Sequence, residues 1–266
     1  MIKALFNASF KSNRILLLAT FGILLMYQTI IINMYDPENA EAMTGMIQLM
    51  PEAVMAAFGF KAAATDLTTH VANFLYGFVF LVFPLIYVIP AGFRMIGKHV
   101  DRGAMVYLLA SPHTRKRIAL TQAVFLLTTV TILLAAAVLS GILFCEAVFP
   151  GMLRIGDYLL LNLVTLGVFY VISGMVFFVS CLFNDSGKVL GAAIGIPAAF
   201  FVFKMLYSAG EELAFFKYLT IYSLTDPKLV FSGTGKALLI TGILLAATAL
   251  IYAAAIRVFD RRSLVI

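Results

Sequence analysis

The sequence has few charged residues: 12% of its 266 residues are Asp, Glu, Lys or Arg, whereas 62% are hydrophobic. Soluble domains contain about 25% charged and about 45–50% apolar residues. A water-soluble globule of this length could not bury so much apolar surface. The composition therefore excludes a soluble enzyme and predicts a protein that lies in a lipid bilayer.

Cysteine and histidine are also scarce, with two and three residues respectively. We expect Cys145 and Cys181 at opposite ends of the membrane, where they are too far apart for a disulfide. None of the histidines has the H-x-x-x-H or H-E-x-x-H spacing that a zinc site on a helix uses. The sequence thus predicts no metal site, no cofactor and no catalytic residue in this chain.

Two segments approach motifs of intramembrane proteases without completing them. Ser173 lacks the glycine that begins a G-x-S-G motif, because Val171 stands there. Residues 211–212 are Glu-Glu, but Phe216 occupies the arginine position of an E-E-x-x-x-R motif. Since a serine protease needs a nucleophile and a base within hydrogen-bond reach, an intramembrane enzyme is only an alternative hypothesis.

A complete phosphate-binding loop is missing as well. Residues 230–237 come nearest to the G-x-x-x-x-G-K-[ST] pattern, but Val230 replaces its first glycine and Ala237 replaces the hydroxyl that would bind magnesium. Any ATP-driven work must therefore be powered by a separate protein. Ionisable residues are also nearly absent from the middle of the apolar segments, which argues against an internal proton or sodium relay. Lys204 is the exception, and we expect it to extend towards the outer end of its helix.

Long apolar runs dominate what is present. Six of them can cross a bilayer, which requires about 20 apolar residues, and they cover residues 15–32, 74–93, 118–144, 158–183, 189–207 and 237–256. They lack the strict alternation of lipid-facing strands, so each must satisfy its backbone as a helix. The sequence predicts an all-α integral membrane protein, with one membrane domain over residues 1–266 and both termini on one side.

The basic residues indicate which side that is. The segments assigned to the inner side hold 13 of the 19 Lys and Arg residues: Lys3, Lys11, Arg14, Arg94, Lys98, Arg102, Arg115, Lys116, Arg117, Lys188, Arg257, Arg261 and Arg262. By the positive-inside rule, both termini are cytoplasmic. These residues are spread over four juxtamembrane segments without a nucleic-acid-binding motif, so we expect contact with anionic membrane lipid and no nucleic-acid partner.

Shorter amphipathic segments are expected at the membrane surfaces. In residues 1–14, Ile2, Leu5, Phe6 and Phe10 share one helical face and basic or polar residues share the other, which favours an interfacial helix over a simple extension of the first span. Residues 46–60 are apolar but too short to cross and are interrupted by Pro51 and Glu52. They predict one or two interfacial helices on the outer side.

The inner loop over residues 94–117 contains a short helical stretch with an apolar centre flanked by charge. It resembles the coupling helix in the membrane subunits of type-2 ABC exporters, where an acidic residue and a glycine precede Leu-Leu-Ser-x-Pro and an arginine. The residues assigned to coupling here are Asp101, Arg102, Gly103, Tyr107, Leu108, Leu109, Ser111, Pro112 and Arg115. Residues 217–227 and 259–264 resemble the family's outer segment and basic tail. The loop departs from the pattern at Ala104, Met105 and His113.

This resemblance implies a function and partners. It implies a permease subunit of an ABC exporter in the cell membrane, driven by a cytosolic ATPase subunit that binds ATP and magnesium. It also implies a second permease copy or a related permease. Two alternatives from other classes are an intramembrane enzyme and a non-transporting scaffold or sensor. The cargo is expected to be hydrophobic or amphipathic, such as a peptide, a lipid or a drug-like molecule.

A repeat of small residues suggests where helices approach closely. Gly187, Gly191 and Gly195 recur every four residues into the fifth apolar run. Small faces of this kind allow close backbone contact between helices in lipid. Packing against another helix of the same chain is one expectation, and a contact between subunits is the other.

Overall fold

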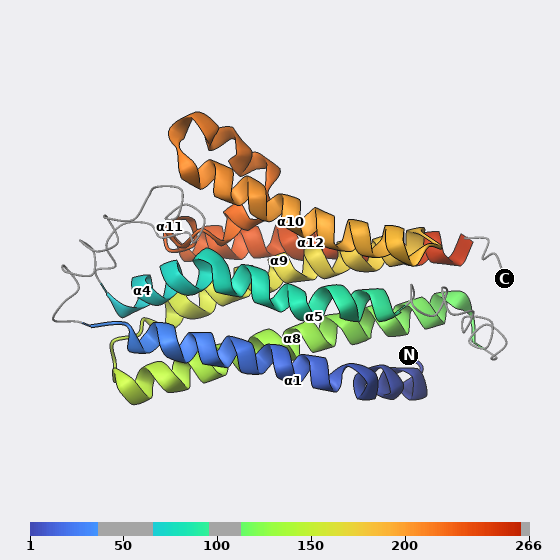
Figure 1. The fold of residues 1–266 in the computed structure, drawn as a ribbon, viewed down its shortest axis with the longest axis horizontal. Helices are drawn as coiled ribbons and strands as arrows, with labels where there is room; N and C mark the ends of the chain where they lie inside the picture. The colour runs from blue at the N-terminus through green and yellow to red at the C-terminus, as the bar shows by residue number, and fades with distance from the viewer. Residues whose placement is uncertain (37–65, 96–112, 262–266) are drawn as a thin grey trace.

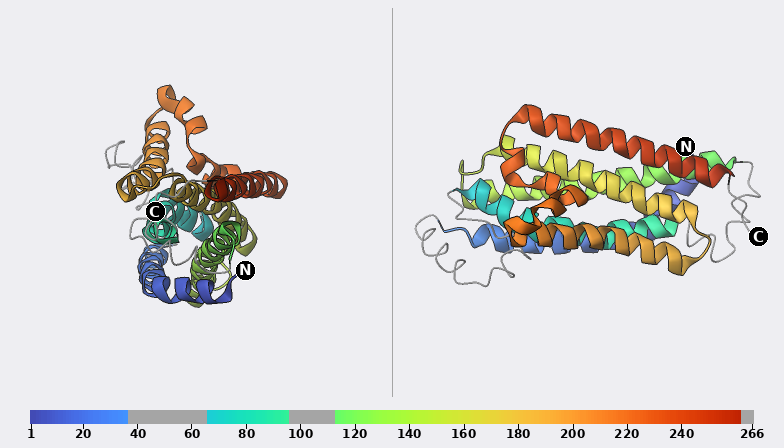
Figure 2. Two further views of the ribbon diagram at one scale, coloured as in Figure 1. Left: turned by 90° about the vertical axis from the view of Figure 1, so that its right-hand side faces the viewer. Right: turned by 90° about the horizontal axis from the view of Figure 1, so that it is seen from above.

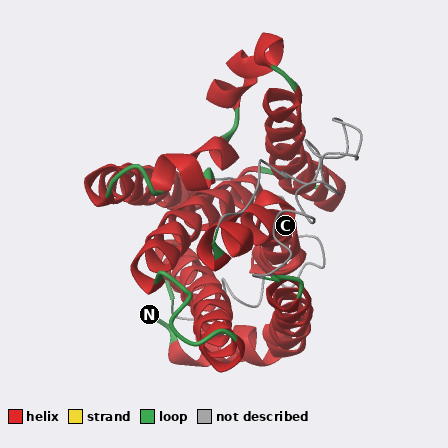
Figure 3. Cartoon of the chain, turned by 90° about the vertical axis from the view of Figure 1, so that its left-hand side faces the viewer, coloured by secondary structure: helices red, strands yellow, loops and turns green. Residues whose placement is uncertain are grey.

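The computed structural model describes residues 1–36, 66–95 and 113–261, and within these ranges the chain is helical and contains no β-strand. The helices lie side by side along one long axis (Figure 1). In chain order they are α1 Lys3–Asn33, α4 Leu67–Phe74, the π-helix η1 Leu75–Val79, α5 Phe80–Met95, α8 Arg115–Val148, α9 Ile155–Leu182, α10 Ser186–Ala209, the 3₁₀-helices η2 Glu211–Leu219 and η3 Ile221–Thr225, α11 Pro227–Val230 and α12 Thr234–Arg261. Figure 3 shows the same all-helical chain from one end of the bundle.

Among the described residues, six helical stretches are long and apolar enough to cross a membrane. They are Lys3–Asn33, Leu67–Met95, Arg115–Val148, Ile155–Leu182, Ser186–Ala209 and Thr234–Arg261. The shortest has 24 residues, which corresponds to about 36 Å of helix against a hydrocarbon core of about 30 Å. Each overlaps one of the predicted spans, and the predicted fold class is confirmed.

Polar residues at the helix starts explain where several of these helices begin. The Asp66 carboxylate accepts from the Thr69 backbone N–H at 3.0 Å before α4, and the Asp185 carboxylate accepts from the Lys188 N–H at 2.9 Å before α10. The Thr114 hydroxyl oxygen accepts from the Arg117 N–H at 3.3 Å before α8. Such caps satisfy backbone donors that the first helical turn leaves unpaired.

Helix α9 forms the centre of the bundle, and α12 packs along it (Figures 1 and 2). Of the 18-residue apolar stretch of α9, 72% is buried inside the protein. Two glycines of α9 allow this close approach. A Cβ atom added to Gly167 would lie 3.0 Å from Leu244 Cδ1, and one added to Gly174 would lie 3.2 Å from Tyr252 Cε2. The Ser173 and Tyr252 hydroxyls are also hydrogen-bonded at 2.9 Å.

The repeated glycines of α10 have a different environment. A Cβ added to Gly191 or Gly195 would meet nothing within 4 Å, and one added to Gly187 would meet only the Asp185 side chain of the preceding cap. Only 17% of the 18-residue apolar stretch of α10 is buried inside the protein. Within the described part of the chain no other helix packs against these glycines, so contact with a second subunit stays a prediction.

The N-terminal helix is continuous with the first span but bent. Figure 2 (left) shows that the first turns of α1, in the darkest blue, run across the end of the bundle, whereas the rest of α1 runs along it. In this helix, Asn13 Nδ2 donates to the Ser9 carbonyl at 2.9 Å. The expected amphipathic helix is therefore present as part of α1, and its position in the headgroup plane stays a prediction.

Candidate functional site

The predicted coupling loop is described only at its two ends. Residues 96–112 lie outside the described part of the chain, and so does every proposed coupling residue except Arg115. The predicted outer helices over 46–60 also lie outside it. Helix α5 ends at Met95 and α8 begins at Arg115, and both ends lie where α12 ends (Figure 1). Arg115 is half-buried there.

The first turns of α1 contact the start of α8. The Ile2 backbone N–H donates to Thr121 Oγ1 at 3.0 Å, and the Ser9 hydroxyl donates to Gln122 Oε1 at 3.0 Å. The Phe6 ring packs edge-on against a phenylalanine of α8, Phe125, with a centroid distance of 5.4 Å. The apolar face predicted for residues 1–14 therefore packs partly against the protein.

The same part of α1 reaches the end of α5. Arg94, in the last turn of α5, donates from Nη1 to Asn13 Oδ1 at 3.3 Å. One short helical segment thus contacts both helices that flank the predicted coupling loop. A force on the loop that separated α5 from α8 would have to displace this segment, because hydrogen bonds join it to both helices.

The opposite end of the bundle is held by an ion-pair cluster. Arg154 lies 2.9 Å from the Asp66 carboxylate and 3.1 Å from the Asp157 carboxylate, and its backbone N–H donates to Thr68 Oγ1 at 2.8 Å. These side chains are partly exposed, so the ion pairs contribute little to the free energy of unfolding. Their effect is to join the starts of α4 and α9.

The segment between α10 and α12 returns into the bundle. Thr220 Oγ1 donates to the Phe200 carbonyl at 2.7 Å, nine residues before the end of α10 at Ala209, which is a return of about 14 Å along that helix. Tyr222 is fully buried, and its hydroxyl donates to the Leu81 carbonyl at 3.5 Å. Irregular backbone at this depth is tolerated because it is covered by protein.

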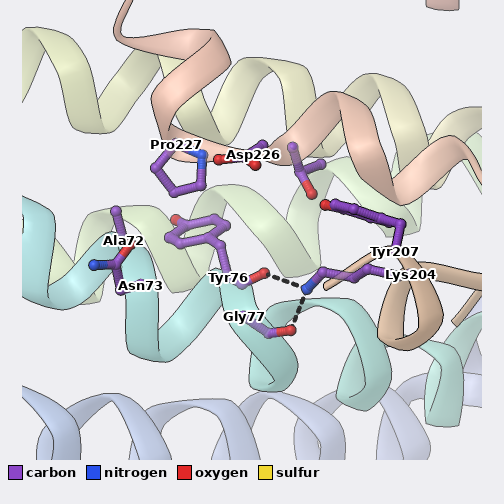
Figure 4. Close-up of a pocket in the computed structure, with 9 residues that line it drawn as sticks. Ala72, Asn73, Tyr76, Gly77, Lys204, Tyr207, Asp226 and Pro227 are labelled. Atoms are coloured by element: carbon purple, nitrogen blue, oxygen red, sulfur yellow. Dashed lines mark hydrogen bonds between the residues drawn. The ribbon is translucent and has the colours of Figure 1, made fainter. Parts of the chain in front are cut away.

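Lys204 is buried in this region, so the expectation that its ammonium group extends to water at the outer end of its helix is wrong. Its Nζ donates to the Tyr76 carbonyl at 3.3 Å and to the Gly77 carbonyl, both in the π-helix η1 (Figure 4). The side chain is only 8% exposed. The sequence shows only a single lysine in an apolar run. The π-helix whose carbonyls accept from this lysine has no sequence signature, so the contact could not be predicted.

An apolar groove lies between α9, α10 and α12, in the half of the bundle nearer the predicted coupling loop. Its volume is about 460 Å³, and the residues that line it are Met175, Phe178, Val179, Ile196, Leu250, Ile251 and Ala254. No side chain in this set offers a charged group. An occupant of the groove would therefore have to be apolar.

The fold defines a class: a multi-pass helical membrane protein. A comparison with known protein families matches residues 3–264 to the ABC-2 family transporter proteins, so the chain belongs to that family. Membership makes it a permease, a transport membrane subunit that works with a separate ATP-binding subunit. No curated protein matches the chain.

Proposed function

We propose that this chain is the membrane-spanning subunit of an ATP-driven exporter that moves a hydrophobic or amphipathic molecule out of the cell. Family membership over nearly the whole chain is the observation that carries this proposal. The apolar groove between α9, α10 and α12 supports a cargo without charge on much of its surface. The chain itself supplies the path, and the ATPase subunit supplies ATP and magnesium binding.

Coupling is assigned to the loop between Arg94 and Arg115, with Asp101 and the 107–109 tip as docking residues. The support is the contact of α1 with both flanking helices, through Asn13 on one side and Gln122 on the other. Closure of two ATPases on nucleotide would move the docked loop, and rigid helices would carry that movement into the bilayer. In this proposal the loop, both termini and the 13 basic residues assigned to the inner side lie in the cytoplasm of a cell-membrane protein.

The exposed glycine face of α10 is assigned to the second permease. A Cβ added to Gly191 or Gly195 would meet nothing within 4 Å in the described part of the chain, and Ile194 between them is 52% exposed. A helix with a small-residue face can approach a partner helix closely enough for van der Waals packing to drive association in lipid. A second copy or a related permease would cover this face.

The most direct test is purification of the complex from the native host in mild detergent. We expect an ATP-binding subunit and a second permease to co-purify, and bound cargo to be identified by mass spectrometry. Deleting residues 107–109 should abolish ATPase association while the protein still inserts. If the isolated chain cleaved a bond or drove solute flux unaided, the proposal would be overturned in favour of an intramembrane enzyme or an independent carrier.

Two substitutions test the coupling residues. Asp101→Asn and Arg115→Gln should each lower transport of the co-purified cargo by about tenfold while ATP hydrolysis continues, because they disturb the joint and not the nucleotide site. Lys116→Gln, at an exposed neighbouring lysine, is the matched control and should transport normally. Wild-type transport by both variants would remove the coupling assignment.

An enzyme of the membrane interior finds no support in the described contacts. Ser173 pairs with Tyr252, and the His70 ring nitrogen Nε2 lies 3.0 Å from the Ile31 carbonyl. The His70 ring packs against Phe74 with a centroid distance of 4.6 Å. These contacts give each side chain a packing role, and they do not join a nucleophile to a base.

A further inference from the structure

The strongest unassigned feature is the ammonium group of Lys204 inside the bundle. It lies five residues before the end of α10 at Ala209, or about 8 Å along the helix axis. The side chain donates to two carbonyls of another helix (Figure 4). A buried charge at membrane depth is costly and persists where its partners serve a function.

The acceptors belong to a special turn of the second span. Between α4 and α5 the chain forms five residues of π-helix, η1, and the Phe80 backbone N–H bonds to the Leu75 carbonyl five residues earlier. Such wide turns occur within α-helices mostly at functional positions. In η1 the Tyr76 and Gly77 carbonyls both accept from Lys204, so α10 is attached to the second span at the point where its helical geometry changes.

A third element meets the other two here. Lys204, Tyr76 and Asp226 line one cavity of about 20 Å³, enough for about one water molecule. Asp226 also accepts from the Lys228 backbone N–H at 3.1 Å and so caps α11. The second span, the fifth span and the returning segment between α10 and α12 therefore converge on one small cavity, and the Lys204 side chain lines it.

We propose that Lys204 is a latch that holds these three elements together at the end of the bundle remote from the predicted coupling loop. Opening that end requires the ammonium to leave the η1 carbonyls. That step breaks two hydrogen bonds of a buried charge in a water-poor environment, so intermediate positions are disfavoured and the end is either closed or open. The latch is a property of this chain alone, whereas its use as the outward gate rests on the proposed function.

Cysteine accessibility tests the latch without any partner. Ala72 lines the same cavity and is 1% exposed, and the native Cys145 and Cys181 can be replaced by alanine. With Lys204 intact, Ala72→Cys should react slowly with a water-soluble maleimide. Adding Lys204→Met should raise the rate by about tenfold, since charge-assisted hydrogen bonds are lost. Lys188→Met, at an exposed lysine of the same helix, should leave the rate unchanged.

A second reporter separates unlatching from unfolding. Ala137→Cys, in α8, is fully buried and should stay unreactive when Lys204 is replaced. If both cysteines become reactive in Lys204→Met, the same two reporters are measured in Lys204→Gln. Reactivity at position 72 alone supports the latch, whereas equal reactivity at positions 72 and 137 in this variant too overturns it. Reactivity at position 72 equal to that with Lys204, in a folded variant, overturns it.

The link to transport is tested separately with the reconstituted ATPase complex. If the latch is the outward gate, ATP turnover should accelerate labelling of Ala72→Cys with Lys204 intact. An effect of Lys204→Met without any effect of ATP would leave the latch in place and count against the proposed export function. The absence of both effects would overturn the latch.

Discussion

Single residues in this protein affect packing mainly through the room available to their side chains and through hydrogen bonds inside the helix bundle. Gly141 shows this, because an added Cβ would lie 2.2 Å from Gln28 Nε2, which donates to the Ala137 carbonyl at 2.9 Å and to the Tyr158 hydroxyl at 3.1 Å. A larger residue would push the amide away from both acceptors. Unpaired polar groups in a bilayer-embedded core cost more than the loss of the contact alone.

Gly92 offers the sharpest test at this scale. A Cβ there would lie 2.6 Å from Val176 Cγ1, a branched side chain that is itself buried. We expect Gly92→Ala to lower the free energy of unfolding by about 1–3 kcal/mol. The native cysteines are buried and free, so their thiol reactivity during heating in detergent reports unfolding without added labels.

Gly191→Ala is the matched control, because it adds the same methyl group to a helix where nothing lies within 4 Å. It should leave the unfolding temperature of the single subunit unchanged or raise it slightly, since alanine is the better helix former. Equal destabilisation by both substitutions would show that the α5–α9 contact is not the reason for glycine at position 92.

Residue-level prediction from sequence was least successful where a neighbouring helix decides the outcome. The contact glycines Gly92 and Gly167 stand alone in apolar runs, and no spacing distinguishes them from lipid-facing positions. The direction of Lys204 depends on a π-turn that lies 127 residues away in the chain. Periodicity along one helix cannot contain such information, because the constraint comes from another helix.

At the scale of elements, the first turns of α1 connect α5 and α8, the two helices that flank the predicted coupling loop, and we call this connection the bracket. Breaking it should affect coupling more than folding, because the bracket joins α8 and α5 through a few polar contacts at the end of the bundle. We expect Ser9→Val combined with Asn13→Leu to keep ATPase association but to lower transport several-fold at unchanged ATP hydrolysis. Asn7→Leu, at an exposed position two residues before Ser9, is the control.

The exposed face of α10 leads to a separate expectation about assembly. Gly191→Ile should weaken the association of two permeases, because the branched side chain keeps a partner helix at a distance. The same change should leave the unfolding temperature of the single chain nearly unaffected, since its own helices do not reach this position. Cross-linking in native membranes measures the dimer fraction. An unchanged fraction would place the second permease on another face.

The elements themselves were largely predictable. Apolar runs of bilayer length indicated all six spans, because hydropathy and backbone satisfaction in lipid leave few alternatives. Their ends were less well predicted: the run over 118–144 belongs to a helix that extends over Arg115–Val148. A helix can continue through polar residues at its ends, whereas hydropathy leaves these residues out of the predicted span. The short helices η2, η3 and α11 carry too few apolar residues to be recognised in this way.

For the whole molecule, the distribution of charge predicts orientation in the membrane. The described basic residues near the ends of α5 and α12 and the starts of α1, α8 and α10 gather at one end of the bundle (Figure 1). Short basic segments of this kind are retained in the cytoplasm during insertion. The turn between α8 and α9 would then face the outside of the cell, and its Met152 is 48% exposed.

Sidedness can be measured on intact cells with the same cysteine-free background. Met152→Cys should react with a membrane-impermeant maleimide added outside, whereas Lys3→Cys, exposed at the start of α1, should react only after the membrane is permeabilised. The reverse pattern would place the predicted coupling loop outside, where no ATPase could reach it. That result would remove the proposed coupling mechanism, whereas the latch at Lys204 would stand, because it depends only on contacts within the chain.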